Sequence, residues 1–244
     1  MIKDHYEMIR KNKIAFWWFQ GRRDLFKAIL KMGIKEKVDF GVDLGCGPMT
    51  NENLYDDFAE NWVSLDYSVE SFKKVEDGKS SLKIIGNLLK TPLKDSSFDL
   101  ILLLDVLEHI ENEDEALGET YRILKKEGLV LVSVPAFKLL WSHHDNQAGH
   151  KRRYTKKEIL EVAKRNNLEV KFSTYFNSSF FVPIFIIRRI LRLLPKGDKK
   201  LEIDLSPEFV DNFFYFILRI ENFINVKLFR IPFGTSVVAL LRKR

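Results

Sequence analysis

The chain has 244 residues and a net charge of +6, with 45% hydrophobic and 30% charged residues, which is typical of one globular domain with an insertion. Its first residues are charged and no apolar run reaches the roughly 20 residues that span a bilayer, so neither a secretory signal nor a membrane-spanning helix is expected. The single cysteine, Cys46, excludes an intramolecular disulfide and favours a reducing, cytoplasmic location.

Helix and strand patterns alternate along most of the chain. A helix is expected from Arg22 to Met32, ended by Gly33. Short apolar runs follow at 38–44, 62–66, 82–86, 98–104 and 129–134, separated by helix-compatible segments at 50–60, 68–76, 112–126 and 155–166. Because runs such as ILLL and LVLV lack polar alternation, they suit strands that helices cover on both faces. With further strands at 166–176 and 235–243, the order predicts a doubly wound α/β fold with a parallel sheet.

The first predicted strand ends in a glycine-rich turn, VDLGCGPMT over residues 42–50. Gly45 and Gly47 allow a sharp bend and close approach of a ligand, and the next helix offers free N–H groups. Asp66 ends the second strand nineteen residues after Gly47, a spacing that suits a carboxylate bound to ribose hydroxyls. A dinucleotide-binding fold would have a third glycine where this chain has Thr50, and a nucleotide-binding Walker-type loop would have a Gly-Lys-Ser/Thr sequence, which is absent. Neither motif fits this turn well.

Several motifs resemble those of class I S-adenosylmethionine-dependent methyltransferases, in the usual order and spacing: VDLGCGP, LDYS, GNLLKTPLKDSSFDLI and LLLDVLEHI. FWWFQGRRDLF and WSHHDNQAGHKRRYT are similar to stretches of a type 11-like subgroup that acts on small molecules or lipids. The resemblance implies S-adenosyl-L-methionine as cofactor and a Rossmann-like, mostly parallel seven-stranded sheet whose last strand is antiparallel. It divides the chain into a cofactor-binding core over 1–177, a helical cap or insertion over 178–231, and a final core strand over 232–244.

The resemblance also implies which residues contact the cofactor. The loop beneath the methionine moiety would consist of Asp43, Gly45, Cys46 and Gly47, with Asp43 near the ammonium group. Asp66 would bind the ribose hydroxyls, with Tyr67 beside the adenine.

Residues after the next two strands would complete the cofactor site. Asn87 and Leu88 would lie at the adenine edge, although the family more often has an aspartate at position 87, which carries a charge that Asn lacks. Leu104 and Asp105 would face the cofactor from below. An alternative for Asp105 is to cap the helix that follows, and Glu108 and His109 are expected to be packing and hydrogen-bonding groups.

The stretch WSHHDNQAGHKRRYT, residues 141–155, has three of the five histidines of the chain. It follows the fifth strand, so it is expected at the carboxyl edge of the sheet, where ligands bind. No metal site is predicted from His143, His144, Asp145 and His150, because adjacent histidines point in different directions and no H-x-x-x-H spacing occurs. Three consecutive cations are also too short a run to indicate nucleic-acid binding.

The preferred interpretation of this stretch is an acceptor-binding loop. Methyl transfer from a sulfonium requires alignment of the nucleophile and, for a hydroxyl acceptor, removal of a proton. Histidine titrates near neutrality, so His144 or His143 is the predicted base, with Asp145 as its partner. An anionic part of the acceptor would be bound by His150, Arg152 and Arg153. Thr155 is expected to cap the next helix, with Glu158 completing a capping box.

The aromatic stretch FWWFQGRR at residues 16–23 has two open interpretations. It can be half of a lid, with Trp17, Trp18 and Phe19 over the cofactor and Arg22 or Arg23 reaching a carboxylate. It can equally be the core face of an amphipathic helix.

The C-terminal segment differs in composition from the rest. Residues 178–244 have twelve Lys or Arg against six Asp or Glu, which accounts for the whole net charge, and ten of the twenty phenylalanines. The segment can be a helical cap or a dimer face, or it can lie among membrane headgroups and so favour a lipid-linked acceptor.

The predicted function is therefore methyl transfer to a small or lipid-linked acceptor, at an oxygen atom. The alternatives are a non-catalytic nucleotide-binding scaffold and a nicotinamide-dependent oxidoreductase, the latter disfavoured by Thr50.

Overall fold

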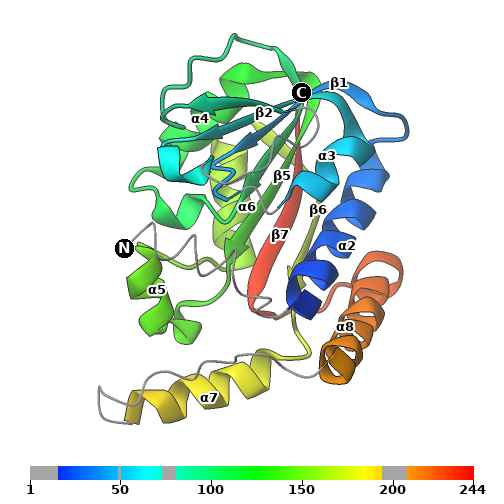
Figure 1. The fold of residues 1–244 in the computed structure, drawn as a ribbon, viewed down its shortest axis with the longest axis vertical. Helices are drawn as coiled ribbons and strands as arrows, with labels where there is room; N and C mark the ends of the chain where they lie inside the picture. The colour runs from blue at the N-terminus through cyan, green and yellow to red at the C-terminus, as the bar shows by residue number, and fades with distance from the viewer. Residues whose placement is uncertain (1–15, 49–50, 73–80, 194–207) are drawn as a thin grey trace.

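The computed structural model describes residues 16–48, 51–72, 81–193 and 208–244 (Figure 1). Thr50 and the second half of the helix predicted over 68–76 lie outside these ranges. The helices are α2 (Phe16–Gly33), α3 (Glu52–Phe58), α4 (Glu113–Ile123), α5 (His143–Ala148), α6 (Lys156–Arg165), α7 (Phe181–Leu193) and α8 (Glu208–Phe223). Four short helical turns are η1 (Val69–Ser71), η2 (Leu107–His109), η3 (Lys138–Leu140) and the π-helical η4 (Ile224–Leu228). The strands are β1 (Val38–Leu44), β2 (Ala59–Asp66), β3 (Ser81–Ile85), β4 (Phe98–Leu104), β5 (Leu124–Pro135), β6 (Leu168–Phe176) and β7 (Ser236–Lys243).

The strands form one seven-stranded sheet in the order β3-β2-β1-β4-β5-β7-β6. The pairings among β3, β2, β1, β4 and β5 are parallel, whereas β7 runs antiparallel to both of its neighbours, β5 and β6. This confirms the predicted Rossmann-like sheet with an antiparallel last strand. The chain leaves β1 in one direction and returns to β4 on its other side, and such a switch point is where ligands bind in open α/β sheets.

Helices cover both faces of the sheet because its central strands are apolar on both sides. In β4, Leu100, Leu102 and Leu104 pack with α2, α3 and α8 in one buried cluster. Their neighbours Ile101 and Leu103 belong to a second cluster with α4 and α6. Figure 1 shows these two helical layers on opposite sides of the sheet. Successive side chains of β4 thus point to opposite faces of the sheet, and both faces are buried. This explains the unbroken apolar runs in the sequence.

The C-terminal insertion packs beside α2. A Cβ atom on Gly21 would lie 2.5 Å from Leu218 Cδ1, so the glycine allows α8 to approach α2 closely. Asn222 Nδ2 donates a hydrogen bond to the Gly21 carbonyl at 2.7 Å. In the same insertion α7 lies beyond the carboxyl ends of the strands (Figure 1), and Arg188 donates to the carbonyl of Leu140 in η3. At this edge α8 is also held, since Ser178 N, just after β6, donates to Glu221 Oε1 of α8 at 2.9 Å.

Several element boundaries differ from the predictions: α2 begins at Phe16 and not at Arg22, and β2 begins at Ala59, inside the helix predicted over 50–60. Two further differences concern the helices predicted over 68–76 and 112–126. Within the described residues, the helix predicted over 68–76 is only the turn η1, which Ser68 caps by accepting from Glu70 N. The helix predicted over 112–126 ends at Ile123, and β5 begins at Leu124. Leu124 pairs with Phe98 and is fully buried, so its side chain is part of the sheet core.

Candidate functional site at the carboxyl edge

Four strands turn sharply as they reach the carboxyl edge. The first residues beyond β1, β4 and β6, and the second beyond β5, have left-handed backbones: Gly45 (φ 74°), Asp105 (φ 56°), Asn177 (φ 61°) and Phe137 (φ 53°). Three of the four are not glycine, and such residues are uncommon outside functional sites and turns. The turns after β1, β4 and β5 hold most of the residues predicted to bind ligands.

The glycine-rich loop after β1 leaves space for a ligand at one glycine only. A Cβ atom at Gly45 would lie 2.7 Å from Val106 Cγ2, whereas one at Gly47 would meet nothing within 4 Å. Gly47 N donates to Asp66 Oδ2 at 2.9 Å, and Ser68 N donates to Asp66 Oδ1 at 2.8 Å. Each carboxylate oxygen keeps a second lone pair. The end of β2 can therefore still accept hydrogen bonds from a pair of hydroxyl groups.

Asp43, near the end of β1, is the most perturbed acid of this loop. Tyr55 donates to its Oδ2 at 2.8 Å, but Oδ1 is buried without a hydrogen-bond partner among the described residues. Burial raises the pKa of Asp43 to about 7, against the hydrogen bonds from Tyr55 and Asn51, which lower it. A buried carboxyl oxygen that lacks a partner costs free energy. A cationic group such as the predicted ammonium would fit this site.

The other residues predicted to contact the cofactor follow β1, β2 and β3 or end β4. Tyr67 is 65% exposed, so its ring is available to stack on a base. Asn87 Oδ1 accepts from Leu89 N at 2.9 Å, which orients this side chain. Leu88, Leu104 and Cys46 are buried, and Cys46 packs in the same cluster as α2 and α3.

Arg22 reaches a carboxylate of the protein itself. Its guanidinium forms an ion pair with Asp105, and its Cζ lies 4.5 Å from the centroid of the Trp18 ring. Both aromatic side chains of the pair Trp17 and Trp18 pack against the cluster of α2 and α3, which favours the core interpretation of this stretch. Asp105 does not cap η2, because Val106 occupies the N-cap position and no side chain caps it.

In the histidine loop, the imidazole that Asp145 orients is that of His150. Asp145 Oδ1 lies 2.8 Å from His150 Nδ1 and accepts from Arg153 Nε at 2.7 Å, and Oδ2 accepts from Ser142 N at 2.7 Å. Burial alone would raise the pKa of Asp145, but the hydrogen bonds from His150 and Arg153 outweigh it and hold that pKa well below its usual range. His143 and His144, the predicted bases, are exposed in the first turn of α5.

The three cations after His150 are engaged within the protein. Lys151 pairs with Glu111, and Arg152 pairs with Glu113. Arg153 donates to the Ala136 carbonyl at 3.0 Å in addition to Asp145. These contacts anchor the loop to β5 and α4, so an acceptor would meet only the remaining N–H groups of Arg152 and Arg153.

One cluster of side chains was not predicted from the sequence. Glu108 and His109 lie beside His150, with one ligand atom of each within 4.8 Å of the others. They belong to loops after β4 and β5, which are adjacent in the sheet. Only the order of the strands in the sheet, which makes β4 and β5 neighbours, could have indicated that these two loops lie together.

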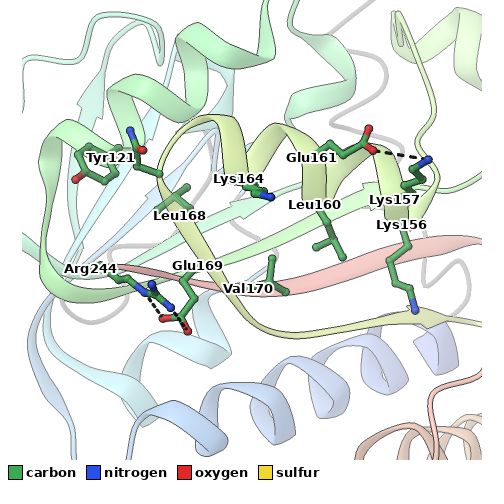
Figure 2. A pocket seen from close by; sticks show the side chains of 11 residues that line it. Tyr121, Lys156, Lys157, Leu160, Glu161, Lys164, Leu168, Glu169, Val170 and Arg244 are labelled. Atoms are coloured by element: carbon green, nitrogen blue, oxygen red, sulfur yellow. Dashed lines mark hydrogen bonds and ion pairs between the residues drawn. The ribbon is translucent and has the colours of Figure 1, made fainter.

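A groove of about 930 Å³ lies elsewhere, along α6 and β6 (Figure 2). Its walls are largely long charged side chains, including the ion pairs Lys157–Glu161 and Arg244–Glu169. Leu168 and Glu169, at one end of the groove, begin β6 at the amino edge of the sheet. The residues that line the groove include none of those predicted to bind cofactor or acceptor, so the groove does not belong to the candidate site.

Comparisons with known proteins agree with this geometry. Residues 42–132 match the family model described as "Methyltransferase domain". An uncharacterized protein of Methanocaldococcus jannaschii is 35% identical over 180 residues, which cover 71% of this chain and 76% of that protein. A Mycolicibacterium smegmatis protein named "Probable S-adenosylmethionine-dependent methyltransferase" is 25% identical over 158 residues, 64% of this chain and 60% of that protein. A Haloferax volcanii protein, solved in complex with the methyltransferase activator Trm112, shares the fold, with a TM-score of 0.58, 17% identity and coverage of 95% and 97% of the two chains.

Proposed function

Because the chain belongs to the class I S-adenosylmethionine-dependent methyltransferases, we propose that it transfers the methyl group to an oxygen atom of a small or lipid-linked acceptor. The acceptor would bind between the glycine-rich loop and the histidine loop. The observation that carries this proposal is the position of the histidine loop at the carboxyl edge. Tyr154 N donates to the Pro135 carbonyl and Phe137 N to the Tyr154 carbonyl, both at 2.9 Å, so the loop is anchored to the end of β5.

Residues of the chain would hold the cofactor as the family resemblance implies. Asp43 would accept from the ammonium group, Asp66 from the ribose hydroxyls, and the backbone at Gly47 would lie against the ligand. S-adenosylmethionine supplies a methyl group that its sulfonium already activates. The protein therefore needs mainly to align the acceptor, to exclude water and to remove one proton.

The proton of a hydroxyl acceptor would pass to His144 or His143. Imidazole titrates near neutral pH, and both rings are exposed where the loop faces solvent. The His144 ring lies 6.2 Å from that of His150, so the proposed base is close to the imidazole that Asp145 holds. We favour His144 for this reason.

The insertion supports a lipid-linked acceptor. Five large side chains repeat at helical spacing along α8 and are 46–74% exposed: Phe209, Phe213, Phe216, Ile220 and Phe223. Exposed apolar side chains also line α7, which adjoins the histidine loop: Val182, Ile186, Ile187 and Ile190. Exposed cations accompany both helices, among them Arg189, Arg219, Lys227 and Arg230. Apolar faces rimmed by cations fit the headgroup region of an anionic bilayer.

In the part of the chain that the structure describes, no helix combines the length and the apolar character needed to cross a bilayer.

The test is methyl transfer to a panel of hydroxyl-bearing metabolites and lipids, with the methylated atom identified by mass spectrometry. Replacing both His143 and His144 by Ala is expected to lower kcat by about 100-fold or more, the usual contribution of a general base. Affinity for S-adenosylmethionine should stay the same, because neither ring belongs to the proposed cofactor site. Gln147→Ala, an exposed change on the same helix, is the control. Equal turnover in the double variant would refute the histidine base, and methylation at nitrogen or carbon would refute the oxygen acceptor.

A further inference from the structure

Two loops bring three potential metal ligands together at the carboxyl edge. Glu108 and His109 lie in η2, after β4, and His150 follows α5, after β5. Lys151 N donates to the Glu108 carbonyl at 2.7 Å, so the backbones of the two loops are joined beside these side chains. The rings of His109 and His150 have centroids 4.8 Å apart and are nearly perpendicular. One ligand atom from each of the three residues lies within 4.8 Å of the other two.

Glu108 provides an independent observation that favours a cation at this place. Its side chain is 1% exposed, and its Oε2 is buried with no hydrogen-bond partner in the described part of the chain. Burying a carboxyl oxygen without a partner costs free energy, and a bound cation would recover it.

His150 is already oriented as a metal ligand would be. Its Nδ1 lies 2.8 Å from Asp145 Oδ1, which leaves Nε2 as the ring nitrogen able to bind an ion. Metal-binding histidines commonly donate their other ring N–H group to a carboxylate, which fixes the ring and increases its basicity.

We propose that Glu108, His109 and His150 form a binding site for a divalent transition-metal ion, with Asp145 positioning His150. Two imidazole nitrogens and one carboxylate suit Zn²⁺, Fe²⁺, Co²⁺ or Mn²⁺, whereas Mg²⁺ and Ca²⁺ prefer oxygen ligands alone. Three protein ligands leave at least one coordination position open. The expectation that no metal binds considered the histidine loop alone; the second loop supplies the ligands that were missing.

The role of the ion rests on the proposed function. An acceptor oxygen bound at the open position would have a lower pKa, because the ion stabilises the oxyanion. His144, whose ring is 6.2 Å from that of His150, could then take the proton more readily.

The site can be tested without cofactor or acceptor, so its failure is distinguishable from failure of the proposed function. Metal-free protein is titrated with Co²⁺, followed by the visible absorption of the bound ion, and the Co²⁺ is then displaced with Zn²⁺. We expect one ion per chain. Ala at His109 or at His150 should weaken binding by at least about 100-fold, and Asp145→Asn by about 10- to 100-fold. Glu108→Gln should also weaken binding while keeping the shape of the side chain.

His143→Ala is the matched control, since it removes a histidine of the same loop that lies outside the cluster. It should leave Co²⁺ affinity unchanged. His109 is exposed, so His109→Ala should fold normally, which thermal unfolding will check. A wild type that binds neither ion, or a His143→Ala variant as weak as His109→Ala, would overturn the site. Equal turnover of metal-loaded and metal-free enzyme would overturn the role in methyl transfer.

Discussion

Arg22 of α2 forms an ion pair with Asp105, the first residue after β4, across 83 positions of the sequence. The Arg22 side chain is 7% exposed and that of Asp105 is 34% exposed. Ser133 of β5 donates to the other carboxylate oxygen of Asp105 at 2.9 Å. One carboxylate thus joins α2, the end of β4 and β5, and holds the left-handed turn at Asp105 in place.

Replacing Arg22 by Met should lower the free energy of unfolding by about 1–3 kcal/mol, the usual loss for a hydrogen bond to a charged group. The loss is limited because solvent reaches Asp105. Arg22→Lys keeps the charge but loses the planar group that stacks on Trp18, so it should be intermediate. Urea denaturation measures both. A Met variant as stable as the wild type would show that the ion pair contributes nothing.

Much of the fold could be predicted because strands buried on both faces have unbroken apolar sequences. The run from Phe98 to Leu104 has the predicted bounds of β4, and Thr155 and Glu158 form the predicted capping box. Both features depend on residues that are close together in the sequence. The boundary at Leu124 was missed because it depends on a distant residue: Leu124 joins the strand by pairing with Phe98.

The candidate site was predictable only in part, for the same reason. Gly47 and Asp66 follow from spacing along the chain, and the structure joins them by a hydrogen bond. The partner of Asp145 could not be chosen among three histidines, because all lie within a few residues of it and the loop conformation decides. The contact between Glu108 and His150 depends on the adjacency of β4 and β5, which the order of elements along the chain does not state.

The two loop glycines should respond differently to replacement by Ala. Both have a left-handed backbone, which costs an Ala about 1–2 kcal/mol. At Gly45 the new methyl group would also collide with Val106, so Gly45→Ala should be the less stable variant. At Gly47 the methyl group would enter the space proposed for the cofactor, so Gly47→Ala should lose more affinity than stability. Thermal unfolding and calorimetry measure the two effects. Equal affinity of Gly47→Ala and wild type would place the cofactor elsewhere.

Asp43 predicts a pH dependence of cofactor affinity. Burial raises its pKa to about 7, so below that pH the group is neutral in the free protein. A cationic ligand favours the ionised carboxylate, so affinity should rise with pH up to about 7 and then level off. Calorimetry at several pH values should show this, and Asp43→Asn should flatten the profile. A wild-type profile that does not change would contradict the proposed contact with the ammonium group.

The same carboxyl group should affect the stability of the free protein. Between about pH 4 and about pH 7 it is protonated in the folded chain but ionised in the unfolded chain. The folded state then binds more protons, so the contribution of Asp43 to the free energy of unfolding falls as pH rises through this window. Denaturation of wild type and Asp43→Asn at both ends of the window isolates the effect. An equal difference at both ends would contradict it.

The exposed face of α8 predicts binding to anionic vesicles. Replacing Phe209, Phe213 and Phe216 together by Ser should abolish flotation with phosphatidylglycerol liposomes but preserve folding, because all three are more than half exposed. Phe40→Ser is the control, since Phe40 is 44% exposed but lies near the start of β1, at the amino edge. Binding should weaken in high salt. A wild type that does not float with these liposomes would remove the membrane proposal.

The central claim is that the bend after β1 and the acid that ends β2 together bind S-adenosylmethionine. Titration calorimetry of the folded protein with S-adenosylmethionine and with S-adenosylhomocysteine tests it most directly. We expect one site per chain for each ligand, and at least about tenfold weaker binding in Asp66→Asn, because a charge-assisted hydrogen bond is lost. Absence of heat and of thermal stabilisation with both ligands, in protein shown to be folded, would contradict the account.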